Sequence, residues 1–172
     1  MSQIETLTIG CEDLSKRPSV SRDLAQFICK LTHLKALTLY GQYHDDFYST
    51  LSSMVSSVKI ATLIINNMRI RERPSASRDL AQFICKLTHL KALTLHGRYH
   101  DDFFSTSSSM VSSVKIATLI INNMRIKERP SASRDLAQFI CKLTHLKALT
   151  LHGRYHDDFF STSSSMVSSV KV

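Results

Sequence analysis

The sequence is poor in residues that break regular structure and lacks the segments that build membrane spans. It has no tryptophan, 4 glycines and 3 prolines among 172 residues, which excludes a collagen-like or linker-rich chain. No apolar run reaches the roughly 18 residues of a transmembrane helix, and no secretory signal precedes Leu7. Since the hydrophobic fraction is 43%, we expect residues 1–172 to form a single domain.

The motifs of catalysis and metal binding are also missing. The chain has no G-x-S-x-G turn and no glycine-rich phosphate loop. Residues 96–102 gather two histidines and two aspartates, but these leave a strand through Gly97 and do not share one helix face. We therefore expect no enzyme activity, no catalytic residue, no metal site and no cofactor.

Repetition is what the chain has in abundance. Residues 21–31 return as 77–87 and 133–143, and residues 133–171 match 77–115 at every position, a period of 56 residues. Such a period is typical of a solenoid, in which each unit buries its apolar face against its neighbours. A catalytic site needs distinct residues that converge on one place, whereas these polar residues recur by translation.

Each period contains two leucine-rich halves. Residues 31–39 follow the pattern L-x-x-L-x-x-L-x-L, and the second half repeats its later part from Ile60. Apolar residues two apart predict a strand with one buried face. Six such pairs occur: Leu7/Ile9, Leu37/Leu39, Leu63/Ile65, Leu93/Leu95, Leu119/Ile121 and Leu149/Leu151.

With this pattern the chain resembles leucine-rich repeat proteins of the ribonuclease-inhibitor-like subtype, which also form the sensor region of NOD-like receptors. The resemblance implies an α/β solenoid, with a curved parallel sheet of about six strands and helices on the convex side. It also implies a cytoplasmic protein of innate immunity. One departure is that the family usually places Asn or Cys five residues after the first strand leucine. The residues found there are Glu12, Gln42, Met68, Arg98, Met124 and Arg154.

Residues 77–87 are predicted to form a helix, as are the equivalent residues 21–31 and 133–143. These helices follow the first, third and fifth predicted strands. Pro74 limits its extension backwards, and Ser75 or Ser77 is the predicted N-cap. Apolar residues fall on one face at helical spacing, namely Leu80, Phe83, Ile84 and Leu87.

Residues 101–114 are predicted to form a short or irregular helix. Asp101 or Asp102 is the predicted N-cap. The many serines weaken the helix because their hydroxyls compete for backbone groups. Three apolar residues are expected to pack it outside the sheet: Phe103, Met110 and Val114.

The four cysteines are predicted to be unpaired. Cys29, Cys85 and Cys141 occupy one repeated position, and Cys11 stands apart. Equivalent positions in a solenoid lie beyond the ~7 Å Cα separation that a disulfide allows. We therefore expect three buried cysteines in a reducing compartment, the cytoplasm.

The concave face of the sheet is the predicted surface for a protein or peptide ligand, because alternate strand residues point away from the core. Turning Ile64 inward would bury Asn66, and the first copy has Thr8 in place of Ile64. An inert lining of small residues is the alternative. The candidate ligand-binding residues are Thr38, Tyr40, Ile64, Asn66, Thr94, His96, Ile120, Asn122, Thr150 and His152.

A second candidate surface is a row of basic loop residues. The net charge of +8 permits contact with an acidic partner or a nucleic acid. No aromatic residue is interleaved for base stacking, and Glu72 and Glu128 offset part of the charge, so a solvated edge is favoured. The basic edge comprises Arg69, Arg71, Arg73, Arg125, Lys127 and Arg129.

Three functions remain open. The chain is a protein-recognition module, a structural or engineered scaffold, or a module that binds acidic partners or nucleic acid. The near-identity of the copies favours a scaffold, while their differences cluster near strand ends, as recognition would require. No polar capping unit is visible at either end. We therefore expect a fragment of a longer solenoid and an oligomer formed through uncapped ends.

Overall fold

The computed structural model describes residues 3–55, 58–70 and 72–166, in which strands and helices alternate along the chain. The strands are β1 (Thr6–Leu14), β2 (Ala36–Tyr43), β3 (Thr62–Arg69), β4 (Ala92–Arg98), β5 (Thr118–Arg125) and β6 (Ala148–Arg154). The helices are α1 (Pro18–Lys30), α2 (Asp45–Met54), α3 (Pro74–Lys86), α4 (Asp101–Met110), α5 (Pro130–Lys142) and α6 (Asp157–Met166). A short 3-10 turn, η2, follows α4 at Val111–Ser113.

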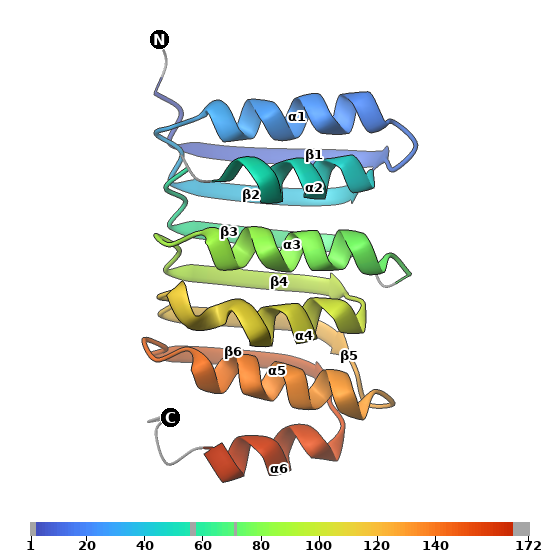
Figure 1. Cartoon of the computed structure of the whole chain (residues 1–172), viewed down its shortest axis with the longest axis vertical. Helices are drawn as coiled ribbons and strands as arrows, with labels where there is room; N and C mark the ends of the chain where they lie inside the picture. Colours follow the sequence, from blue (N-terminus) through green and yellow to red (C-terminus); the bar gives the residue numbers. More distant parts are fainter. Residues whose placement is uncertain (1–2, 56–57, 71, 167–172) are drawn as a thin grey trace.

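All six strands form one parallel sheet in chain order, β1 to β6, and the helices form a layer on one of its faces (Figure 1). Each strand pairs with the next at the same register, so that Leu37 lies beside Leu63 and Leu93 beside Leu119. The predicted α/β solenoid with a parallel sheet of about six strands is therefore confirmed.

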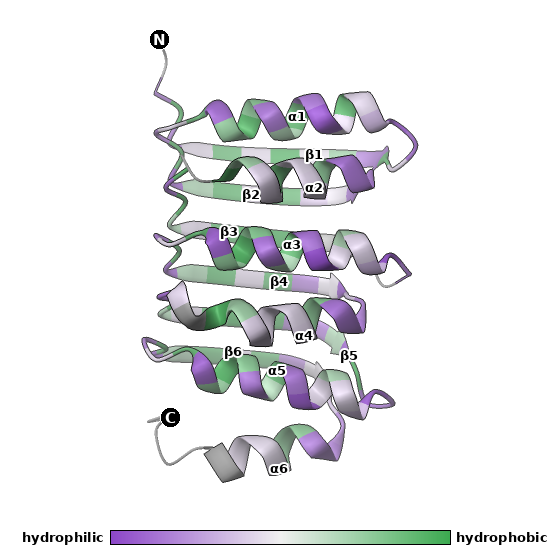
Figure 2. Cartoon of the chain, in the orientation of Figure 1, coloured by the Kyte–Doolittle hydropathy of each residue, from purple (hydrophilic) through white to green (hydrophobic). Residues whose placement is uncertain are grey.

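The core lies between the sheet and the helical layer. The inward leucines Leu37, Leu39 and Leu63 are fully buried, as strand alternation predicts. The predicted inner face of α3 is confirmed, since Leu80, Phe83, Ile84 and Leu87 are all buried. Figure 2 shows this pattern as alternating purple and green bands along α3.

The solenoid curves because its two layers have different spacings. Strands in a sheet lie about 4.8 Å apart, whereas packed helices need about 8–10 Å. Since every strand carries one helix, the helical layer must be the longer one, and Figure 1 shows α1 and α6 extending past β1 and β6. The open sheet face is therefore the concave side.

The predicted N-cap of α3 is wrong. The helix begins at Pro74, and Arg73 occupies the cap position without a side-chain hydrogen bond. Ser77 is instead fully buried. Its hydroxyl donates to the Ile70 carbonyl at 3.1 Å and accepts from the backbone N–H of His100 at 3.4 Å. The serine thus joins the two loops that follow β3 and β4.

The predicted cap of α4 is wrong by one residue. His100 is the N-cap, and its Nδ1 accepts a hydrogen bond from the backbone N–H of Asp102 at 3.1 Å. Asp101 and Asp102 lie in the first turn, where carboxylates complement the helix dipole. The helix has 10 residues and passes into η2, so the expected short or irregular helix is confirmed. Phe103 and Val114, two of the three residues expected to pack it, are buried. Met110 is half-buried and packs against the core.

β5 contains a bulge just before Met124, the position where the resembled family usually has Asn or Cys. Asn123 has a φ of 58°, and the register shifts between Ile121 and Met124. The shift turns Met124 inward, where it is buried. A side chain at the facing Gly153 would clash with the Met124 carbonyl, 2.2 Å from an added Cβ.

Among the described residues, no helix has the length and apolar content needed to cross a bilayer.

Candidate binding surface on the concave sheet

A row of threonines and isoleucines crosses the middle of the concave face. The register places Thr38 beside Ile64, Ile64 beside Thr94 and Thr94 beside Ile120. The four side chains are partly exposed, and Thr150 at the end of the row is exposed. Because neighbours on the same strands are buried, the rigid core fixes the position of this row.

A second, more polar row lies where the strands end. Tyr40 stands beside Asn66, and His96 beside Asn122. The Nδ1 of His152 lies 3.0 Å from Oδ1 of Asn122, a hydrogen-bond distance. Tyr40 is 39% exposed. We call these five residues, Tyr40, Asn66, His96, Asn122 and His152, the polar row.

The two rows together offer mixed contacts on an open surface. The polar row supplies amide, imidazole and phenol groups that donate and accept hydrogen bonds. Ile64 and Ile120 beside it add apolar area at the centre of the face. Among the residues that the structure describes, no helix covers this side of the sheet (Figure 1). Such an arrangement suits an extended polypeptide better than a small substrate, which binds in a concave pocket.

The predicted basic edge is only partly a free surface. Arg73 pairs with Asp45, and Arg129 pairs with Asp101. The Arg129 guanidinium also donates to the Tyr99 carbonyl at 3.0 Å and lies 5.8 Å from the Phe104 ring centroid. These two arginines therefore join successive units of the solenoid.

The remaining members of the basic edge divide into two pairs. Arg125 and Lys127 are exposed and available to an anionic partner. The side chain of Arg69 and the whole of Arg71 lie outside the described residues.

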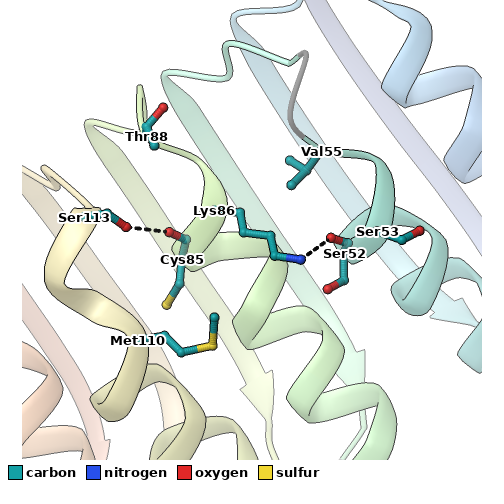
Figure 3. A pocket seen from close by; sticks show the side chains of 8 residues that line it. All are labelled: Ser52, Ser53, Val55, Cys85, Lys86, Thr88, Met110 and Ser113. Atoms are coloured by element: carbon teal, nitrogen blue, oxygen red, sulfur yellow. Dashed lines mark hydrogen bonds between the residues drawn. The ribbon is translucent and has the colours of Figure 1, made fainter.

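A pocket of about 500 Å³ lies between α2, α3 and η2 (Figure 3). The ammonium group of Lys86 points across it and donates to the Ser52 carbonyl at 2.7 Å. On the opposite wall, the hydroxyl of Ser113 donates to the Cys85 carbonyl at 3.2 Å. Both bonds satisfy backbone carbonyls near helix ends, which is a structural role.

Sequence reasoning missed this pocket, although the repeat carried a signal for it. Lys86 recurs as Lys142, which donates to the Ser108 carbonyl at 2.6 Å beside a second pocket of about 390 Å³. A lysine follows the repeated cysteine in every copy, and in the second and third copies it donates to a carbonyl near the end of the preceding helix.

The four cysteines form no disulfide, as expected. Cys29 and Cys85 are buried, whereas Cys141 is only half-buried, so the expectation of three buried cysteines holds for two. Burial raises the pKa of the Cys29 thiol to about 11 and of the Cys85 thiol to about 12. Within the described residues no group of three histidine, cysteine or acidic side chains converges as a metal site would require.

No family model matches this chain, and comparisons with the curated proteins and with the solved structures found no match.

Proposed function

We propose that the chain is a protein-recognition module whose concave sheet binds a protein or peptide, without catalysing a reaction. The observation that carries the proposal is the polar row, which the sheet register aligns on an open face beside the partly exposed Ile64 and Ile120. A leucine-rich repeat protein of the type that senses ligands in NOD-like receptors would use this face. The leucine pattern and the parallel solenoid support that resemblance.

The proposal includes the cytoplasm as the location. Its support is that the four cysteines form no disulfide, a state that a reducing compartment preserves.

The test is a selection of peptide ligands on the intact chain. Binders from a displayed peptide library are retested on a variant that combines Tyr40→Ala, His96→Ala and His152→Ala. We expect binding to fall at least tenfold, because these side chains supply the anchors of the face. Unchanged affinity for the triple variant would remove the concave face as the binding surface.

A matched control uses the same period on the helical side. Ser49, Ser105 and Ser161 are exposed and stand at one position of the three copies. Their combined change to Ala should leave peptide binding intact. Equal losses in the two triple variants would show general instability rather than contact.

A structural scaffold is the second candidate function, and the identity of residues 77–115 and 133–171 favours it. Ligand selection tends to diversify a surface, whereas two identical copies present the same surface twice. Failure to select any peptide on the intact chain would favour the scaffold. Binding of nucleic acid has less support, because Arg73 and Arg129 are engaged within the solenoid.

A further inference from the structure

The last unit of the solenoid exposes side chains that the interior units bury. Phe160 on α6 is 59% exposed and Leu149 on β6 is 41% exposed. Their equivalents Phe104 and Leu93 are 0% and 1% exposed, although the surrounding sequences are identical. In the interior copy, β5 and α5 cover these residues. The uncovered side of β6 and α6 is called the tail face.

The first unit exposes the complementary side. Phe27 on α1 is 46% exposed, whereas its equivalents Phe83 and Phe139 are 1% and 2% exposed. Val20 on the same helix is 44% exposed. The uncovered side of β1 and α1 is called the head face. It is equivalent to the side of β5 and α5 that packs against β4 and α4.

Polar groups at the two ends are complementary as well. At the interior junction, Arg129 of the α5 cap pairs with Asp101 of α4, and Arg73 pairs in the same way with Asp45. The equivalent residues at the ends are Arg17 on the head face and Asp157 on the tail face, both exposed.

Neither of these end residues has an ion-pair partner among the described residues. Contact between the two faces would let Arg17 and Asp157 form the ion pair that the equivalent residues form in the interior copies.

The backbone edges match in the same way. At the interior junction the Lys91 carbonyl accepts from the N–H groups of Ala117 and Thr118, at 2.8 and 3.0 Å. The equivalent carbonyl on the tail face belongs to Lys147, and the equivalent amide on the head face belongs to Thr6. Edge strands of this kind are templates for pairing with another chain.

We propose that the tail face of one molecule binds the head face of a second copy and repeats the β4–β5 junction between molecules. β6 then pairs in parallel with β1 of the second copy, with Ala148 beside Thr6 and Leu149 beside Leu7. Arg17 reaches Asp157 and covers Phe160. This association is independent of ligand binding on the concave face.

A head-to-tail contact is heterologous, so each complex retains one free head and one free tail and can grow. Contact between two tail faces would leave both copies of Asp157 without the arginine that the interior aspartates have, and contact between two heads would leave both copies of Arg17 without an aspartate. Neither symmetric dimer therefore reproduces the ion pair of the interior junctions.

Sedimentation velocity over a range of concentrations tests the proposal with two blocked variants. Phe27→Asp blocks the head and Phe160→Asp blocks the tail, and both positions are exposed, so circular dichroism should show an intact fold. We expect the unchanged chain to gain mass with concentration and each variant to remain monomeric. An equimolar mixture should form a dimer and nothing larger, because only one head and one tail remain functional.

Two results would overturn the proposal: an unchanged chain that stays monomeric at every concentration, or a head-blocked variant that associates as the unchanged chain does. The second result would show symmetric association of tails.

Charge reversal tests the pairing itself. Arg17→Asp and Asp157→Arg should each weaken association, and the double variant should regain it. A double variant that fails to associate would overturn the assigned register. His96→Ala, on the concave face, is the control and should associate normally.

Discussion

The interior segment 93–110 and the terminal segment 149–166 have identical sequences but different surroundings. In the interior copy, β4 alternates partly exposed and buried residues, whereas β6 has none fully buried. Phe104 is fully buried while Phe160 is 59% exposed. Both segments nevertheless form the same strand and helix.

The comparison separates what a unit does alone from what its neighbour does for it. Secondary structure follows the local sequence, since caps, turns and periodicity are the same in both copies. Burial of the outer side chains depends on the next unit, as expected for a solenoid whose stability is a sum of unit and interface contributions. Substitutions at equivalent positions should therefore have unequal costs wherever burial differs between the copies.

The largest inequality is expected at the second phenylalanine of the short helices. Phe104→Ala should lower the free energy of unfolding by about 3–5 kcal/mol, because it removes a fully buried ring from the core. Phe160→Ala should change it by about 0.5 kcal/mol or less, as surface substitutions do. Urea denaturation of dilute protein measures both, and equal losses would contradict the dependence on neighbours.

Substitution of the repeated buried serine should cost the same free energy of unfolding in both copies. Ser77→Ala leaves the N–H of His100 without a partner, at an expected cost of about 1–3 kcal/mol. Ser133→Ala should cost the same although it lies nearer the end, because Ser133 is also fully buried and accepts from His156 N–H at 3.2 Å. Thermal denaturation compares the two variants. A clearly smaller cost at Ser133 would show that the last unit is loosened throughout.

A smaller difference is expected between the first and second copies. The Tyr43 hydroxyl donates to the Tyr40 carbonyl at 2.9 Å, whereas the buried hydroxyl of Tyr99 has no partner within the described residues. Tyr43→Phe should cost about 1 kcal/mol. Tyr99→Phe should be neutral or slightly stabilising, because it removes a polar atom that burial leaves unsatisfied. A cost at Tyr99 equal to that at Tyr43 would indicate a bound partner such as water.

The smallest effect concerns reactivity and not stability. Cys141 is half-buried and Cys85 is buried, with its thiol pKa raised to about 12. Since the thiolate is the nucleophile, iodoacetamide should modify Cys141 faster than Cys85. Residues 79–86 and 135–142 are identical, so peptide mapping cannot separate them. Single-cysteine variants give the two rates, and faster labelling of Cys85 would contradict the comparison.

The sequence was sufficient to predict the solenoid, its strands and the inward leucines, because these depend on local periodicity repeated in every copy. Ile64 lies outward and partly exposed, while Leu63 and Ile65 are buried. Strand alternation together with the first copy's Thr8 predicted this arrangement.

The helix caps were not predictable in the same way. Ser77 resembles an N-cap in sequence, but its hydroxyl bonds to a carbonyl seven residues earlier and to an amide 23 residues later. Such partners are set by the packing of neighbouring units. The engagement of Arg73 and Arg129 by aspartates 28 residues away has the same origin. Part of the basic edge is therefore an internal link.

Amide hydrogen exchange of β4 and β6, measured by NMR on dilute protein, shows how far a neighbouring unit stabilises a strand. Leu93 and Leu149 have the same neighbours in sequence, so their intrinsic exchange rates are equal, and any difference reports local opening. The amides of β4 should exchange far more slowly than those of β6. The difference should shrink as protein concentration rises, because the tail face of one molecule then binds the head face of another. Equal protection of the two strands in dilute protein would contradict the claim that neighbouring units bury what a single unit cannot.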